Sequence, residues 1–371
     1  MAGPKASARV DAPVDAPAAA PVDAPAAAPG DAPRDAPVGI PRDAPRAAWD
    51  ATPPDGQHAG WVSNGLVIAA VDGSEHSLRA LEWARAAALR HGTGLMVAHV
   101  LSDSSQLYAG RRSSLHDPSE PDEFADPVSD HLRALLARAP ELPADVRYES
   151  LEGSVPEALR VIGTEARMLV MGSRGRGGFA TLLLGSNSRA VATSAPCPVV
   201  VVPHEARSAG ASEEASAGRV VLGLHAAETP DDVPVFAFEE AAARGTAVQV
   251  VSAYAIPPSP VALIDSPFAV ITPEGLADGG EGVPAEREML RSQTERLAPL
   301  RARFPDVPVE QVAVPGDAAG RLVDASRSAA LVVVGRHHPR VRSLLIGSVA
   351  NAVLQHAHGP VAVVPPLSDD D

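Results

Sequence analysis

Residues 171–192 read MGSRGRGGFATLLLGSNSRAVA, in which four glycines lead to Gly185-Ser186, where a helical pattern begins. The apolar run RMLVMG at 167–172 predicts a strand before this loop. A glycine-rich loop between a strand and a helix is typical of phosphate binding, because glycine lets backbone N–H groups approach an anion. The stretch therefore predicts an α/β fold that holds a phosphate group.

The same alternation of strands and helices begins near residue 65. Short apolar runs predict strands, and apolar residues at helical spacing between them predict helices. The predicted strands are LVIAAV (66–71), LMVAHVL (95–101), VRYESLEG (146–153), RMLVMG (167–172) and CPVVVVP (197–203). Continuous Val and Leu runs that alternate with helices indicate a parallel sheet covered on both faces. We expect a doubly wound, five-stranded, Rossmann-like sheet.

The pattern then occurs a second time. The segment LLIGSVANAVLQHAHGPVAVVPP (344–366) mirrors LLLGSNSRAVATSAPCPVVVVP (182–203) nearly position by position. Two tandem copies of one α/β domain follow from this repeat. The expected division of the chain is a tail at residues 1–58, a first domain at 62–204, a linker at 205–217, a second domain at 218–366 and an acidic end at 367–371.

Composition narrows the class of protein. The tail repeats Asp-Ala-Pro, which favours a disordered, semi-stiff spacer. The net charge of -15 argues against nucleic acid or an anionic membrane as the main partner, because both require a basic surface. The single cysteine, Cys197, fits a reducing compartment, and no apolar run approaches the roughly 18 residues of a membrane span. We therefore expect a cytoplasmic protein.

Two common phosphate-binding templates fit the loop poorly. A P-loop requires Gly-Lys-Ser/Thr, and the loop contains no lysine. The dinucleotide fingerprint can be placed on GRGGFA (175–180), with Glu205 as its acidic partner. That fingerprint belongs after the first strand of its unit, however, and here nine residues separate Gly175 from Gly185. Both templates are therefore disfavoured.

A third template matches every position. The spacing Gly172-x2-Gly175-x9-Gly185-Ser186, with VDGS at 71–74 and HV at 99–100, resembles the nucleotide-binding signature of the universal stress protein family. The resemblance covers residues 62–366, both copies included. It implies an adenine-nucleotide-binding fold, ATP with Mg²⁺ as the cofactor and a role in the stress response.

Physical chemistry supports a phosphate site at this loop. The glycines let the backbone approach phosphate oxygens, and the helix that opens at Ser186 directs free N–H groups and its positive end toward an anion. Serine hydroxyls add donors, and Arg174 either adds charge or faces solvent. The predicted cofactor-binding residues are Ala70, Asp72, Val100, Met171, Gly172, Arg174, Gly175, Gly185, Ser186, Asn187 and Ser188.

The other half of the site is expected at the ends of the first two strands. Ligands of open parallel sheets lie beyond the carboxyl ends of the strands, where the strand order reverses. The resemblance implies that Asp72 and Val100 hold the ribose and the adenine. The alternative for Asp72 is that it caps the helix that begins after Ser74. His99 should point to the opposite face of its strand, as a packed histidine rather than a ligand.

The second copy has lost the signature. Asp72 aligns with His225, Gly175 aligns with His338, and the loop is one residue shorter. ATP is therefore expected in the first domain only. The basic residues of the second loop form either an independent anion site or a solvated basic loop, and metal binding by its histidines is not expected. These residues are Arg336, His337, His338, Arg340 and Arg342.

Three classes of function follow. Neither loop motif, GSRGRGG nor GSNS, supplies a carboxylate or a lysine, which phosphoryl chemistry requires, so we predict no catalytic residue and no structural metal. A nucleotide-dependent sensor or regulator is favoured over a slow ATP hydrolase and over a nucleotide-independent interaction module. The last strands, PVVVV (198–202) and PVAVV (360–364), should pair antiparallel and join the two domains. Homodimerisation through other surfaces stays open.

Overall fold

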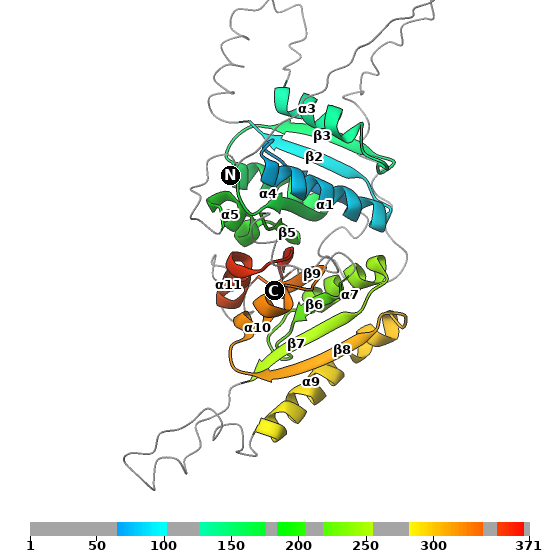
Figure 1. The fold of residues 1–371 in the computed structure, drawn as a ribbon, viewed down its shortest axis with the longest axis vertical. Helices are drawn as coiled ribbons and strands as arrows, with labels where there is room; N and C mark the ends of the chain where they lie inside the picture. Colours follow the sequence, from blue (N-terminus) through cyan, green and yellow to red (C-terminus); the bar gives the residue numbers. More distant parts are fainter. Residues whose placement is uncertain are drawn as a thin grey trace, which may run out of the picture. The chain divides into compact units, whose positions relative to one another are not determined.

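The computed structural model describes residues 65–101, 126–175, 184–204, 218–254, 282–336 and 347–366. The predicted tail, linker and acidic end lie outside these residues. Within them the chain folds as alternating strands and helices, with helices on both faces of one sheet (Figure 1). The predicted α/β class and the parallel, Rossmann-like sheet are confirmed.

The first copy contains five strands. Its elements are β1 (Leu66–Ala70), α1 (Glu75–His91), β2 (Leu95–Val100), α3 (Pro127–Leu136), β3 (Val146–Leu151), α4 (Val155–Ile162), the 3₁₀ turn η2 (Gly163–Glu165), β4 (Ala166–Gly172), α5 (Ser186–Ser194) and β5 (Val199–Val202). These strands agree with the five runs expected from the sequence to within two residues at each end.

The second copy repeats this order. Its elements are β6 (Val220–Gly223), α7 (Asp232–Arg244), β7 (Val248–Tyr254), α9 (Gly282–Arg303), β8 (Val309–Pro315), α10 (Ala318–Ala325), β9 (Leu331–Gly335), α11 (Ser348–His356) and β10 (Val361–Val364). Helices α1 and α7 end in the same way, because Gly92 and Gly245 adopt left-handed conformations with φ of 61° and 62°.

The strands form one sheet in the order β3-β2-β1-β4-β5-β10-β9-β6-β7-β8. All neighbours within a copy are parallel. The order reverses between β1 and β4, so the carboxyl ends of these two strands open a crevice. The second copy has the equivalent reversal between β6 and β9.

Two apolar layers cover the sheet. Helices α1, α3, α7 and α9 pack on one face, and α4, α5, α10 and α11 pack on the other. The layers consist mainly of Val, Leu and Ala, as the low aromatic content of 3% requires. The fully buried rings of Phe236 and Phe238, both on α7, are the exceptions among the largest buried side chains.

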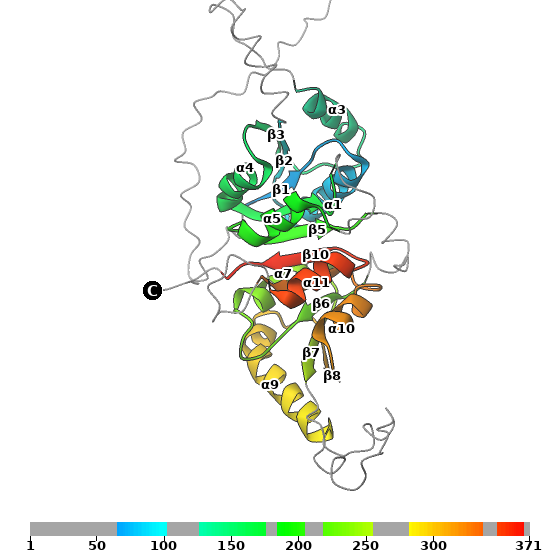
Figure 2. The same ribbon diagram turned by 90° about the vertical axis from the view of Figure 1, so that its left-hand side faces the viewer.

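The two copies meet along their last strands. β5 pairs antiparallel with β10, with Val200 opposite Ala362 and Val201 opposite Val361 (Figure 2). All four side chains are at most 2% exposed. This antiparallel step is the only change of strand direction among the strands that the structure describes.

Replacing Val200 by proline tests this junction. Val200 lies between Val170 of β4 and Ala362 of β10, and proline removes a ladder N–H and distorts the strand. We expect Val200→Pro to aggregate or to lose its single cooperative unfolding transition in calorimetry. The control Val200→Ala keeps the backbone bonds and should unfold cooperatively at a slightly lower temperature. A proline variant with wild-type mass and unfolding midpoint would contradict the junction.

Candidate functional site

A cavity of about 400 Å³ opens at the carboxyl ends of β1 and β4. All eleven residues predicted to bind the cofactor line it. They come from the ends of β1, β2 and β4, from the loop after β4 and from the first turn of α5. The sequence prediction missed five further lining residues, which are Val71, Ser77, Ala98, Val155 and Leu159.

The glycines of the loop are required by close contacts. A Cβ on Gly172 would lie 2.9 Å from the carbonyl oxygen of His76, and one on Gly175 would lie 2.7 Å from Oδ2 of Asp72. Real Cβ atoms do not approach other atoms this closely, so a larger residue at Gly172 would displace backbone, and one at Gly175 would displace the Asp72 carboxylate or the loop. At Gly185 the nearest contact would be 3.3 Å, which is tight but less severe.

Helix α5 presents a free N-terminus to the cavity. Its N-cap is Gly185, and no side chain caps it, so the N–H groups of its first turn keep their capacity to bind an anion. The hydroxyl of Ser188 donates to the carbonyl oxygen of Gly172 at 2.8 Å. The proton of Ser188 therefore secures the glycine loop in this structure rather than pointing at a ligand, whereas no such bond engages Ser186 within the described residues.

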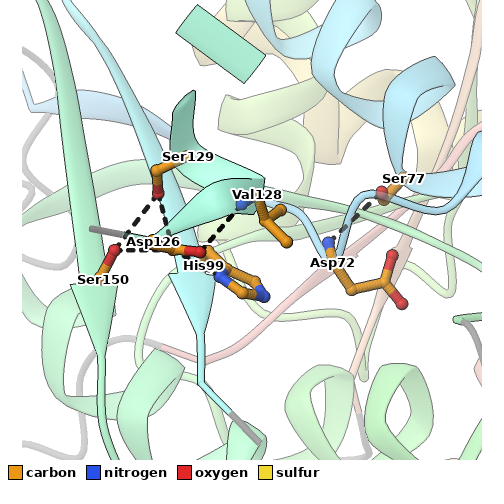
Figure 3. Close-up of polar contacts among 7 residues, drawn as sticks. All are labelled: Asp72, Ser77, His99, Asp126, Val128, Ser129 and Ser150. Carbon is orange, nitrogen blue, oxygen red and sulfur yellow. Dashed lines mark hydrogen bonds and ion pairs between the residues drawn. The ribbon is translucent and has the colours of Figure 1, made fainter. Parts of the chain in front are cut away.

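Asp72 lines the cavity and also shapes the turn before α1. Its Oδ1 accepts hydrogen bonds from the N–H of Ser74 at 3.0 Å and from the hydroxyl of Ser74 at 2.6 Å. Ser74 is the N-cap of α1, because its hydroxyl accepts from the N–H of Ser77. The N–H of Asp72 donates to Ser77 Oγ at 3.3 Å (Figure 3). Asp72 thus supports the cap, and Oδ2 faces Gly175.

Arg174 is held at the rim of the cavity by a histidine that the sequence prediction missed. Its Nη2 lies 2.9 Å from Nε2 of His204, which follows β5. Arginine only donates, so Nε2 must accept and His204 is neutral in this geometry. The ring of His204 also contacts that of His76, with 6.1 Å between centroids. No spacing pattern in the sequence marked His204.

His99 faces away from the cavity, as the alternation of side chains along β2 predicted. Its Nδ1 lies 2.6 Å from Oδ2 of Asp126, which also accepts from the hydroxyls of Ser129 and Ser150 at 2.8 Å each (Figure 3). Burial alone would raise the pKa of Asp126, but these hydrogen bonds lower the pKa to about 2. The network ties α3 to β2 and β3 behind the cavity.

The second copy differs from the first at two described positions of the equivalent site. His225, at the position of Asp72, is exposed, and its Nδ1 lies 3.6 Å from Oε2 of Glu228. Gly223, at the position of Ala70, is covered by Leu322, because a Cβ there would lie 2.9 Å from Cδ1 of that leucine. Leu322 therefore packs closely against the end of β6 in the second copy.

Of the two alternatives for the basic loop of the second copy, a solvated loop is wrong for Arg336. This residue is half-buried, and its Nη1 donates to the carbonyl oxygen of Ala195 at the C-terminal end of α5, at 2.6 Å. Burial lowers the pKa of Arg336. The other residues of the predicted cluster, His337, His338, Arg340 and Arg342, lie outside the described residues.

No three His, Cys, Asp or Glu side chains among the described residues come together in a way that could hold a metal ion. No helix in the described ranges is both long and apolar enough to cross a membrane.

The fold and the cavity define a Rossmann-like α/β protein with a crevice at the strand reversal, and comparison with known proteins gives the family. The profile of the Universal stress protein family matches residues 65–203 and 217–365. The chain therefore belongs to the universal stress protein family, with two copies of the family's domain.

Relatives share this tandem organisation. Universal stress protein Rv2005c of Mycobacterium tuberculosis is 31% identical over 307 residues, covering 80% of this chain and 96% of the relative. Universal stress protein Rv1996 of the same organism is 30% identical over 314 residues, covering 80% and 94%. The crystal structure of a universal stress protein from Archaeoglobus fulgidus covers 82% of this chain and 99% of its own, with a TM-score of 0.53 and 18% identity, which shows the shared fold.

A side chain at Gly175 tests the cavity as a binding site. We expect Gly175→Ala to weaken ATP binding by about tenfold or more in calorimetric titration, because the new Cβ displaces the Asp72 carboxylate or the loop. The control is His338→Ala at the aligned position of the second copy, which should leave ATP affinity unchanged. Equal affinities for Gly175→Ala and the unaltered protein would place the ligand elsewhere.

Proposed function

We propose that this protein binds ATP in its first domain and acts as a nucleotide-dependent sensor or regulator in the stress response. The observation that carries the proposal is the convergence of the eleven predicted residues on one cavity at the point where the strand order reverses. Membership of the universal stress protein family supports it. The proposal also assigns the two domains to residues 62–204 and 218–366 and places the protein in the cytoplasm.

The lining divides into two parts of different chemistry. The glycine loop, the free N-terminus of α5 and the guanidinium of Arg174 favour the phosphates, because they offer N–H donors and positive charge. Ala70, Val100 and Leu159 line the cavity with apolar side chains that suit an adenine ring. Asp72 is suited to accept hydrogen bonds from ribose hydroxyls. Mg²⁺ bound with ATP would neutralise part of the phosphate charge.

Restriction of ATP to the first domain rests on three differences in the second. His225 cannot accept two hydroxyl hydrogen bonds as a carboxylate can, and it is turned toward Glu228. Glycine replaces Ala70 of the first copy at Gly223, and Leu322 packs closely against it. Arg336 is engaged with Ala195 of the first copy and is therefore directed away from a second-copy ligand.

The same lining favours binding over catalysis. Universal stress proteins are generally not conventional enzymes. Asp72 is the single carboxylate among the described lining residues, and its Oδ1 is occupied by two hydrogen bonds from Ser74. A general base for water and a cationic clamp for developing charge are the requirements of phosphoryl transfer. Arg174 alone does not meet both.

We also propose that the two domains pair within one chain in solution, through β5 and β10. The register between Val199–Val201 and Val361–Val363 and the near-complete burial of these side chains support this pairing. An apolar edge strand without such a cover would invite aggregation. Further self-association through helices is compatible with the proposal.

One ATP per chain is the first expected outcome. Calorimetric titration of the full-length protein with ATP should give a stoichiometry near one, because only the first cavity has the complete lining. The same titration with cAMP is informative, because one universal stress protein has been solved in complex with cAMP. A stoichiometry near two would refute the restriction to the first domain, and absence of binding by any adenine nucleotide would favour a nucleotide-independent interaction module.

Negligible turnover is the second expected outcome. Incubation of the protein with ATP and Mg²⁺ should release phosphate far more slowly than a typical enzyme rate of about 1 per second or faster. The variant Gly175→Ala serves as the control, because any slow release that depends on the cavity should disappear in it. Sustained release at enzymatic rates would identify a hydrolase.

A further inference from the structure

Buried charges accompany the apolar junction between the two copies. His91 and Arg167 belong to the first copy, and Glu239 and Glu240 belong to α7 of the second. Nε2 of His91 lies 2.6 Å from Oε1 of Glu240, and Nη2 of Arg167 lies 3.0 Å from Oε2 of Glu239. The side chain of Glu240 is 0% exposed, and those of His91 and Arg167 are 7% exposed each. We call these four residues the junction cluster.

Further arginines surround the two glutamates of the junction cluster. Arg244 lies 3.3 Å from Oε2 of Glu240, and Arg303 lies 3.5 Å from Oε1 of Glu239. Arg244 and Arg90 both lie over the ring of Trp83, at 5.3 and 5.6 Å from its centroid. Burial would raise the pKa of Glu240, but the hydrogen bond from His91 and the charge of Arg244 lower the pKa to about 2. Glu240 is therefore an anion at neutral pH.

Comparison of the two copies shows that the acidic residues of the junction cluster occur only in the second copy and its arginine only in the first. Gly92 and Gly245 cap their helices identically, so Glu240 occupies the position of Ala87 in the first copy, and Glu239 that of Ala86. Gly172 and Gly335 end equivalent strands, so Arg167 corresponds to Ala330. The acids are thus absent from the equivalent helix of the first copy.

Two alternative pairings can be compared with the one in the structure. A pair of first copies would place Ala86 and Ala87 where Glu239 and Glu240 now lie. Each such pair would bury two copies of Arg167 without the carboxylate of Glu239, and removing one partner of a buried ion pair is strongly destabilising. In a pair of second copies, each Glu239 would face Ala330 in place of Arg167.

We infer that the junction cluster makes the apolar edge of the first copy selective for an acidic partner helix, which this chain's own second copy provides. The inference rests on the proposed pairing of the domains in solution. The apolar strands supply attraction without discrimination, because any valine-rich edge can pair with another. The junction cluster adds the discrimination, since a domain with alanine at the two acidic positions offers no carboxylate to the buried Arg167.

A charge swap in the full-length chain tests the inference. Arg167→Glu places a third carboxylate beside Glu239 and Glu240, and Glu239→Arg places a second guanidinium beside Arg167. Each single variant should lower the midpoint of thermal unfolding by about 5–10 °C and promote self-association, as two exposed edge strands would. The double variant Arg167→Glu/Glu239→Arg restores opposite charges. It should regain at least half of the decrease in unfolding midpoint, and its mass in solution should equal that of the wild type.

A matched control distinguishes the junction from the surface. Glu157 and Arg160 form an exposed ion pair on α4, with side chains 61% and 46% exposed, and their swap should change neither the midpoint nor the mass. Failure of the double variant to recover, or single variants that behave like the exposed control, would overturn the inference. If small-angle scattering of the wild-type chain showed separated domains, the proposed pairing itself would be overturned. Titration with ATP tests the binding proposal independently of both.

Discussion

An open parallel sheet leaves its last strand with an unpaired edge, and this constraint governs the whole molecule. In each copy the last strand, β5 or β10, is a run of four buried residues rich in valine. Pairing the two edges with one another satisfies the backbone of both strands and buries both apolar surfaces at once. The antiparallel junction also turns the carboxyl ends of the two copies in opposite directions. The strands of the first copy therefore end, at its cavity, on one side of the sheet. The strands of the second copy end, at its altered site, on the opposite side.

The second copy contributes to the first beyond its edge strand. Arg336 occupies the position of Ser173, since the N–H groups of both residues donate to the last residue of the neighbouring strand. Its guanidinium reaches the C-terminal end of α5, the helix whose N-terminus lines the cavity. A cation at a helix C-terminus stabilises the helix. A residue from the altered loop thus supports the element that presents N–H groups to the cavity.

The glycine loop could be predicted from sequence because its requirements are local. Gly172 and Gly175 follow a strand directly, and the contacts that exclude a side chain there come from the same end of the sheet. The partners of His99 and Arg174 could not be predicted in this way, since Asp126 and His204 are 27 and 30 residues away along the chain. The destination of Arg336 was missed because it lies 141 residues away, in the other copy. The spacing of residues in the sequence predicts local backbone geometry, whereas the partners of side chains depend on how distant elements pack together.

Joining both copies in one chain has a consequence for how such a molecule can change. When two identical subunits meet about a two-fold axis, every substitution is made twice, once on each side of the interface. Here a single substitution alters one side alone. The pair of Arg167 and Glu239 has alanine at both equivalent positions, Ala330 and Ala86, and Arg336 stands where the first copy has Ser173. A symmetric pair could not carry such one-sided differences. Covalent linkage thus allowed one half to keep its cavity while the other was free to diverge.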